Sequence, residues 1–220
     1  MNNTCRVLLA DDHLLIAEGI QKLLEPEFEF VGIVADGRSL VAAVTKLQPD
    51  IAIVDISLPL LNGLDASQHI KKENPDVKII VLTMHSEPTF VEQAFRVGVS
   101  GYVLKQSVGS ELVQAIHEVL KGNTFISPMV TQGLVDPVVN PASSVSPGEG
   151  DTLPQSLSAR QREVLQLVAE GKATKEIAWI LDVSIKTVEF HKTRIMKELG
   201  LRSAAELTKY AITAGLTSIH

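Results

Sequence analysis

Residues 51–63 of this chain read Ile-Ala-Ile-Val-Asp-Ile-Ser-Leu-Pro-Leu-Leu-Asn-Gly. The first part, up to Asp55, is apolar and rich in β-branched side chains, which is typical of a strand buried on both faces. Pro59 and Asn62 then favour a loop, and an amphipathic pattern of helical period begins at Gly63. A buried strand followed at once by a helix predicts a parallel sheet with helices packed on it.

The same alternation of strand and helix patterns extends in both directions over residues 1–127. Strands are expected at 6–10, 30–35, 51–55, 77–82 and 101–104, and helices at 14–24, 38–47, 63–72, 89–97 and 109–121. Five strands that each precede a helix predict an α/β domain with a doubly wound, five-stranded parallel sheet. In such sheets the functional residues gather beyond the carboxyl ends of the strands.

Five polar residues stand at these carboxyl ends. Asp11 and Asp12 follow the first strand, Asp55 ends the third, and Thr83 and Lys105 follow the fourth and fifth. Three carboxylates on one rim repel one another unless a cation lies between them, and their hard oxygen ligands suit Mg²⁺. A hydroxyl and an ammonium group complete a site for a phosphoryl group. A lone aspartate at a strand end is usually a turn or cap residue, but this combination indicates a function.

The charge of the chain is divided unevenly, which indicates separate units. Residues 1–127 hold ten Lys and Arg against sixteen Asp and Glu, whereas residues 157–220 hold ten against seven. The front unit is therefore acidic, with a net charge of −6, and the back unit is basic, with +3. Between them, residues 128–156 are rich in Pro, Gly, Ser and Asn, and this composition predicts a flexible linker.

The basic back unit is expected to be a small all-α domain of four helices. Ser158 is a good N-cap for the first helix, Gly171 ends it, and further helices are expected at 174–181, 185–199 and 203–214. A short helix and a long basic helix joined by a tight turn are typical of a helix-turn-helix. The third helix has an inward stripe of Val188, His191, Ile195 and Leu199, and an outward stripe of Lys186, Glu189, Phe190, Thr193 and Lys197. The outward stripe is predicted to enter the major groove of double-stranded DNA.

The front unit carries a specific set of motifs: Asp11-Asp12, Asp55-Ile56-Ser57-Leu58-Pro59, Asn62-Gly63, Thr83, and Lys105 after Gly101-Tyr102-Val103-Leu104. In these it resembles the receiver domain of two-component signalling, which has a flavodoxin-like fold. The resemblance implies that a partner histidine kinase phosphorylates Asp55, with Mg²⁺ held by Asp11, Asp12, Asp55 and the backbone carbonyl of Ser57. It also implies that Thr83 and Lys105 bind the phosphoryl oxygens, and that Tyr102 turns inward when Thr83 moves.

The back unit carries Arg160-Gln161-Arg162-Glu163-Val164-Leu165, Gly171, Lys175-Glu176-Ile177-Ala178, Leu181, Ser184, Thr187-Val188, His191 and Ile195. These residues resemble the LuxR-type helix-turn-helix, and a receiver followed by this module is similar to NarL/FixJ-type response regulators. The resemblance implies base contacts by Glu189, Phe190 and Thr193, and phosphate contacts by Lys186, Thr187, Lys192 and Arg194. It further implies a homodimer on DNA, with a seam on the fourth helix formed by Leu207, Tyr210, Ala211 and Ala214.

Two function classes stay open at this point. The first is a transcription factor controlled by phosphorylation, and the second is a DNA-binding or interaction protein whose receiver is controlled by a partner without phosphate. An aspartyl-phosphate phosphatase fits poorly, because the acidic pair is adjacent and the better nucleophile, Asp55, ends the third strand. The chain is therefore expected to accept a phosphoryl group without being an enzyme in the usual sense.

The remaining composition favours a cytoplasmic protein without membrane contact. Cys5 is the single cysteine, no apolar run is long enough to cross a bilayer, and the first residues lack a signal-peptide layout.

The linker is long enough for the two units to touch. We expect the unphosphorylated front unit to cover part of the helix at 186–197 or the seam on the fourth helix. Trp179, which lies off the buried stripe of its helix, is a further candidate for contact with the front unit.

Overall fold

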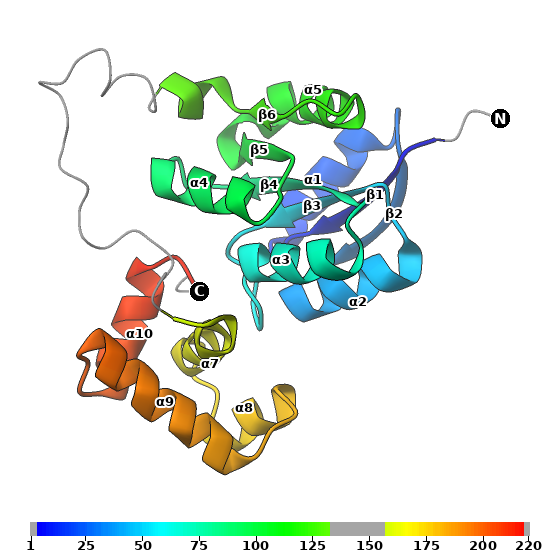
Figure 1. Cartoon of the computed structure of the whole chain (residues 1–220). Helices are drawn as coiled ribbons and strands as arrows, with labels where there is room; N and C mark the ends of the chain where they lie inside the picture. Colours follow the sequence, from blue (N-terminus) through cyan, green and yellow to red (C-terminus); the bar gives the residue numbers. More distant parts are fainter. Residues whose placement is uncertain (1–3, 133–156, 218–220) are drawn as a thin grey trace, which may run out of the picture.

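The computed structural model describes residues 4–132 and 157–217. These residues form an amino-terminal α/β domain and a carboxyl-terminal helical domain that lies against one end of it (Figure 1).

The amino-terminal domain is built on a sheet of parallel strands in the order β2-β1-β3-β4-β5-β6. The strands are β1 (Arg6–Ala10), β2 (Glu29–Val34), β3 (Ile51–Asp55), β4 (Lys78–Thr83), β5 (Gly101–Leu104) and β6 (Phe125–Ile126). Five of them match the expected strands, and β6 is an addition. It has two residues and pairs with β5, which is too short a segment to show an alternating pattern in the sequence.

Helices cover both faces of the sheet. One face packs against α1 (Leu14–Leu24) and α5 (Val108–Leu120), and the other against α2 (Gly37–Leu47), α3 (Gly63–Glu73) and α4 (Pro88–Arg96). Successive residues of a strand point to opposite faces, so Val7 and Leu9 join the first core and Leu8 and Ala10 the second. A short 3₁₀ helix, η1 (Lys105–Ser107), leads from β5 into α5. The doubly wound architecture predicted from the sequence is confirmed.

The carboxyl-terminal domain consists of α7 (Ala159–Ala169), α8 (Thr174–Ile180), α9 (Ile185–Leu199) and α10 (Ala204–Thr213). Ser158 caps α7 as predicted: its hydroxyl accepts from the Gln161 backbone, while the Gln161 side chain accepts from the Ser158 backbone. Gly200 ends α9 with φ = 68°. This left-handed backbone conformation is less favourable for residues that carry a side chain than it is for glycine. Val188 and Ile195 of α9 are buried, and Leu199 and His191 are half-buried, so the predicted inward stripe is observed.

The first part of the predicted linker is ordered. Residues 128–132 are helical, and Val130 is buried, with 1% of its surface exposed. Burial of the Val130 side chain stabilises this helix, although turn-forming residues surround it in the sequence. The amino-terminal domain therefore extends beyond residue 127. The rest of the predicted linker, 133–156, lies outside the described residues.

Polar contacts between the two domains join α7 to the loop between β3 and α3 and to the first turn of α3. The guanidinium of Arg162 donates to both carboxylate oxygens of Asp65, which is 3% exposed. The Gln166 amide bridges the loop, because its nitrogen donates to the Leu58 carbonyl (2.9 Å) and its oxygen accepts from the Asn62 backbone (2.8 Å). Side chains of α7 therefore replace water at polar groups of the loop.

The same interface continues on either side. The Glu170 carboxylate accepts from the backbone N–H of Leu60 (3.0 Å), and Arg38 of α2 donates to Glu163 (2.7 Å). Leu60 has φ = 64°, the left-handed region that a branched side chain rarely adopts. The bond to Glu170 helps to hold this strained residue in place.

The expectation that the amino-terminal domain covers α9 is wrong, whereas the end of α10, next to the predicted seam residue Ala214, does lie against α4, where Gly215 contacts Phe90. The outward residues of α9 are exposed, Phe190 to 60%, and α9 lies on the side of its domain away from the sheet (Figure 1). Trp179 is 84% exposed, so it does not contact the amino-terminal domain.

The expected seam on the fourth helix is also corrected. Leu207, Ala211 and Ala214 are buried, and α10 packs against α7, which leaves Tyr210 as the one partly exposed residue of the four. Spacing alone does not separate an apolar stripe that fills the domain's own core from one that binds a second copy.

We predict that Gly63→Ala destabilises the amino-terminal domain by about 1–3 kcal/mol or more, because a Cβ atom there would lie 1.9 Å from the carbonyl oxygen of Asp55. Gly19→Ala is the control, since Gly19 lies in α1 and has nothing within 4 Å of its Cβ position. This change should be neutral or slightly stabilising. Urea unfolding followed by circular dichroism measures both, and equal midpoints would contradict the prediction.

Candidate functional site

The carboxyl ends of β1, β3 and β5 bring two carboxylates and one ammonium group together. Asp11 and Asp55 are buried, 2% and 3% exposed, and the Nζ atom of Lys105 lies 2.8 Å from Asp11 Oδ2 and 2.9 Å from Asp55 Oδ2. The sheet order makes this possible, because β1 and β3 are neighbours and Lys105 follows β5 two strands away. The predicted convergence of these residues is observed.

Asp12 and His13 extend the acidic group toward the surface. The Nδ1 atom of His13 lies 2.8 Å from Asp12 Oδ1 and 3.3 Å from Asp11 Oδ1, and the His13 backbone donates to Asp11. Sequence reasoning missed His13. Its position directly after the acidic pair was the available signal, but histidine is not a preferred ligand of the Mg²⁺ that the aspartates suggested.

The charges at this rim are strongly coupled. Burial raises the pKa of Asp55 above its ordinary value, and the Lys105 ammonium and a hydrogen bond from the Ser57 backbone act in the opposite direction. Burial alone would lower the pKa of Lys105, but the carboxylates of Asp55 and Asp11 outweigh it and raise that pKa. Lys105 therefore stays charged and stabilises the ionised form of Asp55, which would otherwise bind a proton.

The donor set fits a hard divalent cation. One ligand atom from each of Asp11, Asp12, His13 and Asp55 can be chosen so that all lie within 4.8 Å of one another. Three carboxylates and one ammonium group, which contacts Asp11 and Asp55, meet at this rim, so negative charge remains for a cation to balance, and carboxylate oxygens suit Mg²⁺. This acidic pocket is typical of a magnesium site. The part assigned to the Ser57 carbonyl stays a prediction.

The two predicted switch residues share a neighbour. Thr83 is fully buried at the end of β4, and its hydroxyl accepts from the backbone N–H of His85 (3.1 Å). Tyr102 is also buried, and its hydroxyl donates to the carbonyl of His85 (2.9 Å). Burial raises the pKa of Tyr102, so the phenol keeps the proton that it donates. In this structure Tyr102 is already turned inward.

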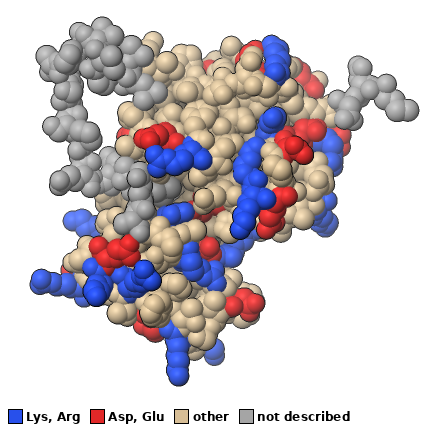
Figure 2. Space-filling view, viewed as in Figure 1, with Lys and Arg blue, Asp and Glu red and all other residues tan. Residues whose placement is uncertain are grey.

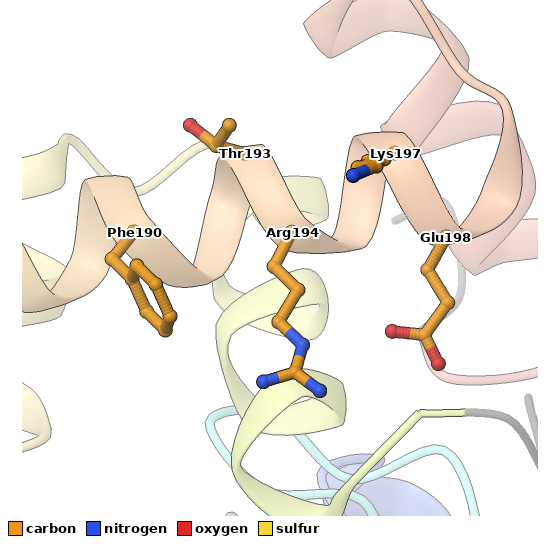
Figure 3. Close-up of a pocket in the computed structure, with 5 residues that line it drawn as sticks. All are labelled: Phe190, Thr193, Arg194, Lys197 and Glu198. Atoms are coloured by element: carbon orange, nitrogen blue, oxygen red, sulfur yellow. The ribbon is translucent and has the colours of Figure 1, made fainter.

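The second predicted site is the surface of α9. Lys186, Glu189, Phe190, Thr193, Arg194 and Lys197 are exposed, while Thr187 and Lys192 are half-buried. Figure 3 shows that Phe190, Arg194 and Glu198 project from the same side of this helix, and these three residues line a shallow pocket together with Thr193 and Lys197. Basic side chains stand out from this domain in Figure 2 as well. The residues assigned to DNA contacts are thus presented on one accessible helix.

Glu189 is held in one orientation by its neighbours. Its Oε1 atom accepts from the Thr174 hydroxyl of α8 (2.8 Å) and lies 3.2 Å from the Lys192 ammonium. The hydrogen bond from Thr174, followed by that from Lys192, lowers the pKa of Glu189, so the group stays an ionised acceptor. Thr174 was not predicted as a site residue, because its contact with Glu189 joins two helices.

Family models match both parts of the chain. The response regulator receiver domain matches residues 7–117, and the bacterial regulatory proteins of the luxR family match residues 155–211. The chain belongs to the NarL family of response regulators.

Individual relatives match over almost the whole chain. The oxygen regulatory protein NreC of Staphylococcus carnosus is 38% identical over 210 residues, which are 94% of this chain and 96% of that protein. RcsB of Salmonella enterica serovar Typhimurium, bound to promoter P1flhDC with phosphomimetic BeF₃⁻, is 31% identical with a TM-score of 0.58, covering 96% and 99% of the two chains. A structure of two RcsB dimers on two parallel DNAs gives 31% identity, a TM-score of 0.57 and the same coverage.

This response regulator is a transcription factor of a two-component system with a LuxR-type DNA-binding domain, and it is not an enzyme in the usual sense. Its receiver implies a kinase partner. Among the described residues, none of the helices has the length and apolar character needed to span a bilayer.

We predict that Asp12→Ala lowers the affinity for Mg²⁺ by about tenfold or more, because it removes one of the converging carboxylates. His13→Ala should change that affinity much less, since Mg²⁺ prefers oxygen ligands. Isothermal titration calorimetry of the full chain with MgCl₂ compares the two variants. A larger loss for His13→Ala than for Asp12→Ala would show that the donor set has been misassigned.

Proposed function

We propose that Asp55 accepts a phosphoryl group from a partner histidine kinase and that this controls sequence-specific DNA binding by α9 as a homodimer. The observation that carries the proposal is the position of Asp55: it is buried at a strand end, with Lys105 Nζ at 2.9 Å and Asp11 and Asp12 beside it. Among the aspartates of this rim, only Asp55 lies both at the end of a central strand and against Lys105 and the Ser57 backbone.

The proposed transfer is a substitution at phosphorus. A carboxylate oxygen of Asp55 attacks the phosphorus of a phosphohistidine, the P–N bond breaks, and its electron pair stays on the imidazole of the kinase. Mg²⁺ held by Asp11, Asp12, Asp55 and the Ser57 carbonyl would neutralise the phosphoryl oxygens. Lys105 and the Thr83 hydroxyl would bind those oxygens, which draws Thr83 toward Asp55.

The DNA part of the proposal rests on the exposed side of α9. Glu189, Phe190 and Thr193 would contact bases, and Lys186, Thr187, Lys192, Arg194 and Lys197 would contact the backbone. An ionised Glu189 only accepts, so it suits the amino group of a cytosine, while the bare Phe190 ring suits a thymine methyl. One helix reads few base pairs, so two copies on adjacent half-sites supply the specificity. Because a protein that binds promoter DNA acts where the chromosome is, we propose that this protein is located in the cytoplasm.

We predict that Asp55→Asn abolishes the mass gain of one phosphoryl group that acetyl phosphate and Mg²⁺ give to the wild-type chain. Asp50→Asn is the control, because Asp50 precedes β3 at the opposite end of the sheet and should leave labelling intact. Intact-protein mass spectrometry gives the result. Stoichiometric labelling of the Asp55→Asn chain would show another acceptor, and absence of labelling in the wild-type chain would favour the partner-controlled alternative.

We predict that two α9 variants lose DNA binding in different ways. Lys186→Ala should weaken binding on all sequences and reduce the salt slope by about one unit, because it removes one phosphate contact. Glu189→Ala should relax the preference at one base position and cost roughly 1–3 kcal/mol on the best site. Fluorescence anisotropy on specific and random duplexes at several salt concentrations separates the two. A Glu189→Ala loss that is equal on both duplexes would make Glu189 a surface residue.

A further inference from the structure

Thr174, the first residue of α8, links the two helices of the helix-turn-helix. Its hydroxyl donates to Oε1 of Glu189 in α9 (2.8 Å), across 15 residues of sequence. Thr174 is half-buried, whereas Glu189 lies on the exposed side of α9. A residue of α8 therefore contacts one of the side chains that are proposed to read bases.

Lys192, one turn after Glu189 in α9, closes this contact into a ring. Its Nζ atom lies 3.2 Å from Glu189 Oε1 and 3.3 Å from Thr174 Oγ1. An ammonium group only donates and an ionised carboxylate only accepts, whereas a hydroxyl does both. Thr174 must therefore accept from Lys192 and donate to Glu189, so the direction of each bond in the ring is fixed.

The ring engages one oxygen of Glu189 and leaves the other unused. Both bonds to the carboxylate end on Oε1, and within residues 4–132 and 157–217 no donor bonds to Oε2. The Glu189 side chain is 53% exposed, so it remains open to solvent. The two oxygens thus have separate roles: Oε1 anchors the side chain, and Oε2 is available to a donor from another molecule.

The ring also balances a charge that DNA would repel. A carboxylate that approaches the duplex meets the negative field of the phosphates, and the Lys192 ammonium at 3.2 Å offsets its charge. An ammonium group has three N–H donors. Two of them go to Thr174 and Glu189, so the third is left for the phosphate contact proposed for Lys192.

We propose that Thr174 is a positioning residue for base recognition. Together with Lys192 it holds Oε1 of Glu189, so that Oε2 is presented to the amino group of a cytosine in the major groove. The inference rests on the proposed function, because it takes Glu189 as a residue that reads a base. It adds a residue of α8 that acts through Glu189 and makes no base contact of its own.

The physical reason is the freedom of an unanchored glutamate. A long side chain that is mobile before binding loses rotamer entropy when a base orders it, whereas an anchored side chain has already lost it. Cytosine and adenine both present an amino group in the major groove, but within different patterns of donors and acceptors. A mobile carboxylate can follow either amino group, whereas a fixed one is matched to one of them. Loss of the anchor should therefore reduce specificity more than it reduces general affinity for DNA.

The first test selects binding sites from a pool of DNA duplexes with a randomised segment, using the full-length chain treated with acetyl phosphate and Mg²⁺. Glu189→Ala identifies the base position that Glu189 reads, which is the position whose preference this change removes. Thr174→Val keeps the shape of the side chain without the hydroxyl, and it should lower the preference for cytosine over adenine there by about tenfold. Thr174→Ser keeps the hydroxyl and should restore most of the preference.

Thr208→Val is the matched control. Thr208 is a half-buried threonine of the same domain, and its hydroxyl donates to the Ala204 carbonyl within α10. This change should leave the base preference as it is in the wild type. If Thr174→Val instead weakens binding to all duplexes alike and leaves the base preference unchanged, the proposal is overturned and Thr174 is a phosphate contact or a structural residue.

The second test asks whether Thr174 acts through Glu189. The hydrogen bond from Thr174 lowers the pKa of Glu189, so Thr174→Val should raise that pKa in the free chain, which an NMR titration of the carboxyl group measures. In a Glu189→Ala background, Thr174→Val should remove no further preference, because its target is absent. An unchanged pKa, or a further loss in the double variant, would refute the route through Glu189.

Failure of the proposed function gives a different result. If Glu189→Ala removes no preference at any position, the proposed base contact fails and the inference fails with it. If Glu189→Ala removes a preference that Thr174→Val keeps, the base contact stands and only the role of Thr174 is refuted.

Discussion

The ammonium group of Lys105, placed between Asp11 and Asp55, is the interaction on which the rest of the site depends. Two buried carboxylates a few ångströms apart would bind a proton if no cation faced them. Asp11 and Asp55 lie close together because β1 and β3 are neighbours in the sheet. Lys105 reaches both carboxylates because β4 and β5 follow β3 in that order. The topology of the sheet is thus a condition of the chemistry, and the apolar strands that build it supply no functional group of their own.

The loop after Asp55 belongs to two structures at once. Its start donates to Asp55 through the Ser57 backbone, and polar groups of Leu58, Leu60 and Asn62 are bound by Gln166 and Glu170 of the other domain. Leu60, with φ = 64°, sits in the middle of this segment. A strained residue persists only where its surroundings fix it, and here part of those surroundings is supplied by α7. Chemistry at Asp55 and docking of the second domain are therefore not independent.

Sequence reasoning placed the elements and the rim well because both follow local rules. Buried strands of five residues and amphipathic helices have clear periods, and residues that follow parallel strands meet at one edge. It missed β6 and the helix at 128–132, which are too short or too rich in turn residues to show a period. It also read the stripe of Leu207 and Ala211 as a seam, although the stripe fills the domain's own core. Thr174 and the contacts of α7 depend on which segments meet in space, and one sequence carries no pattern for that, whereas His13 stands directly after the acidic pair and was missed because histidine is not a preferred ligand of Mg²⁺.

The open position of α9 limits what the proposed phosphorylation would have to achieve. Because the side of α9 proposed to read bases is already accessible, control would not consist of uncovering it and would instead act on how the DNA-binding domains of two copies are placed relative to each other. Docking against the receiver fixes the positions of α7 and of the end of α10. It therefore restricts the orientations in which this DNA-binding domain can contact that of a second copy. The interface is mixed: ion pairs join Arg162 to Asp65 and Arg38 to Glu163, and apolar residues of both domains belong to one buried cluster. A neutral hydrogen bond there contributes only about 0.5–1.5 kcal/mol net, because water replaces it on separation, but charged partners and apolar burial contribute more. A phosphoryl group on Asp55 can open such an interface only if it stabilises the separated state by more than these contacts contribute.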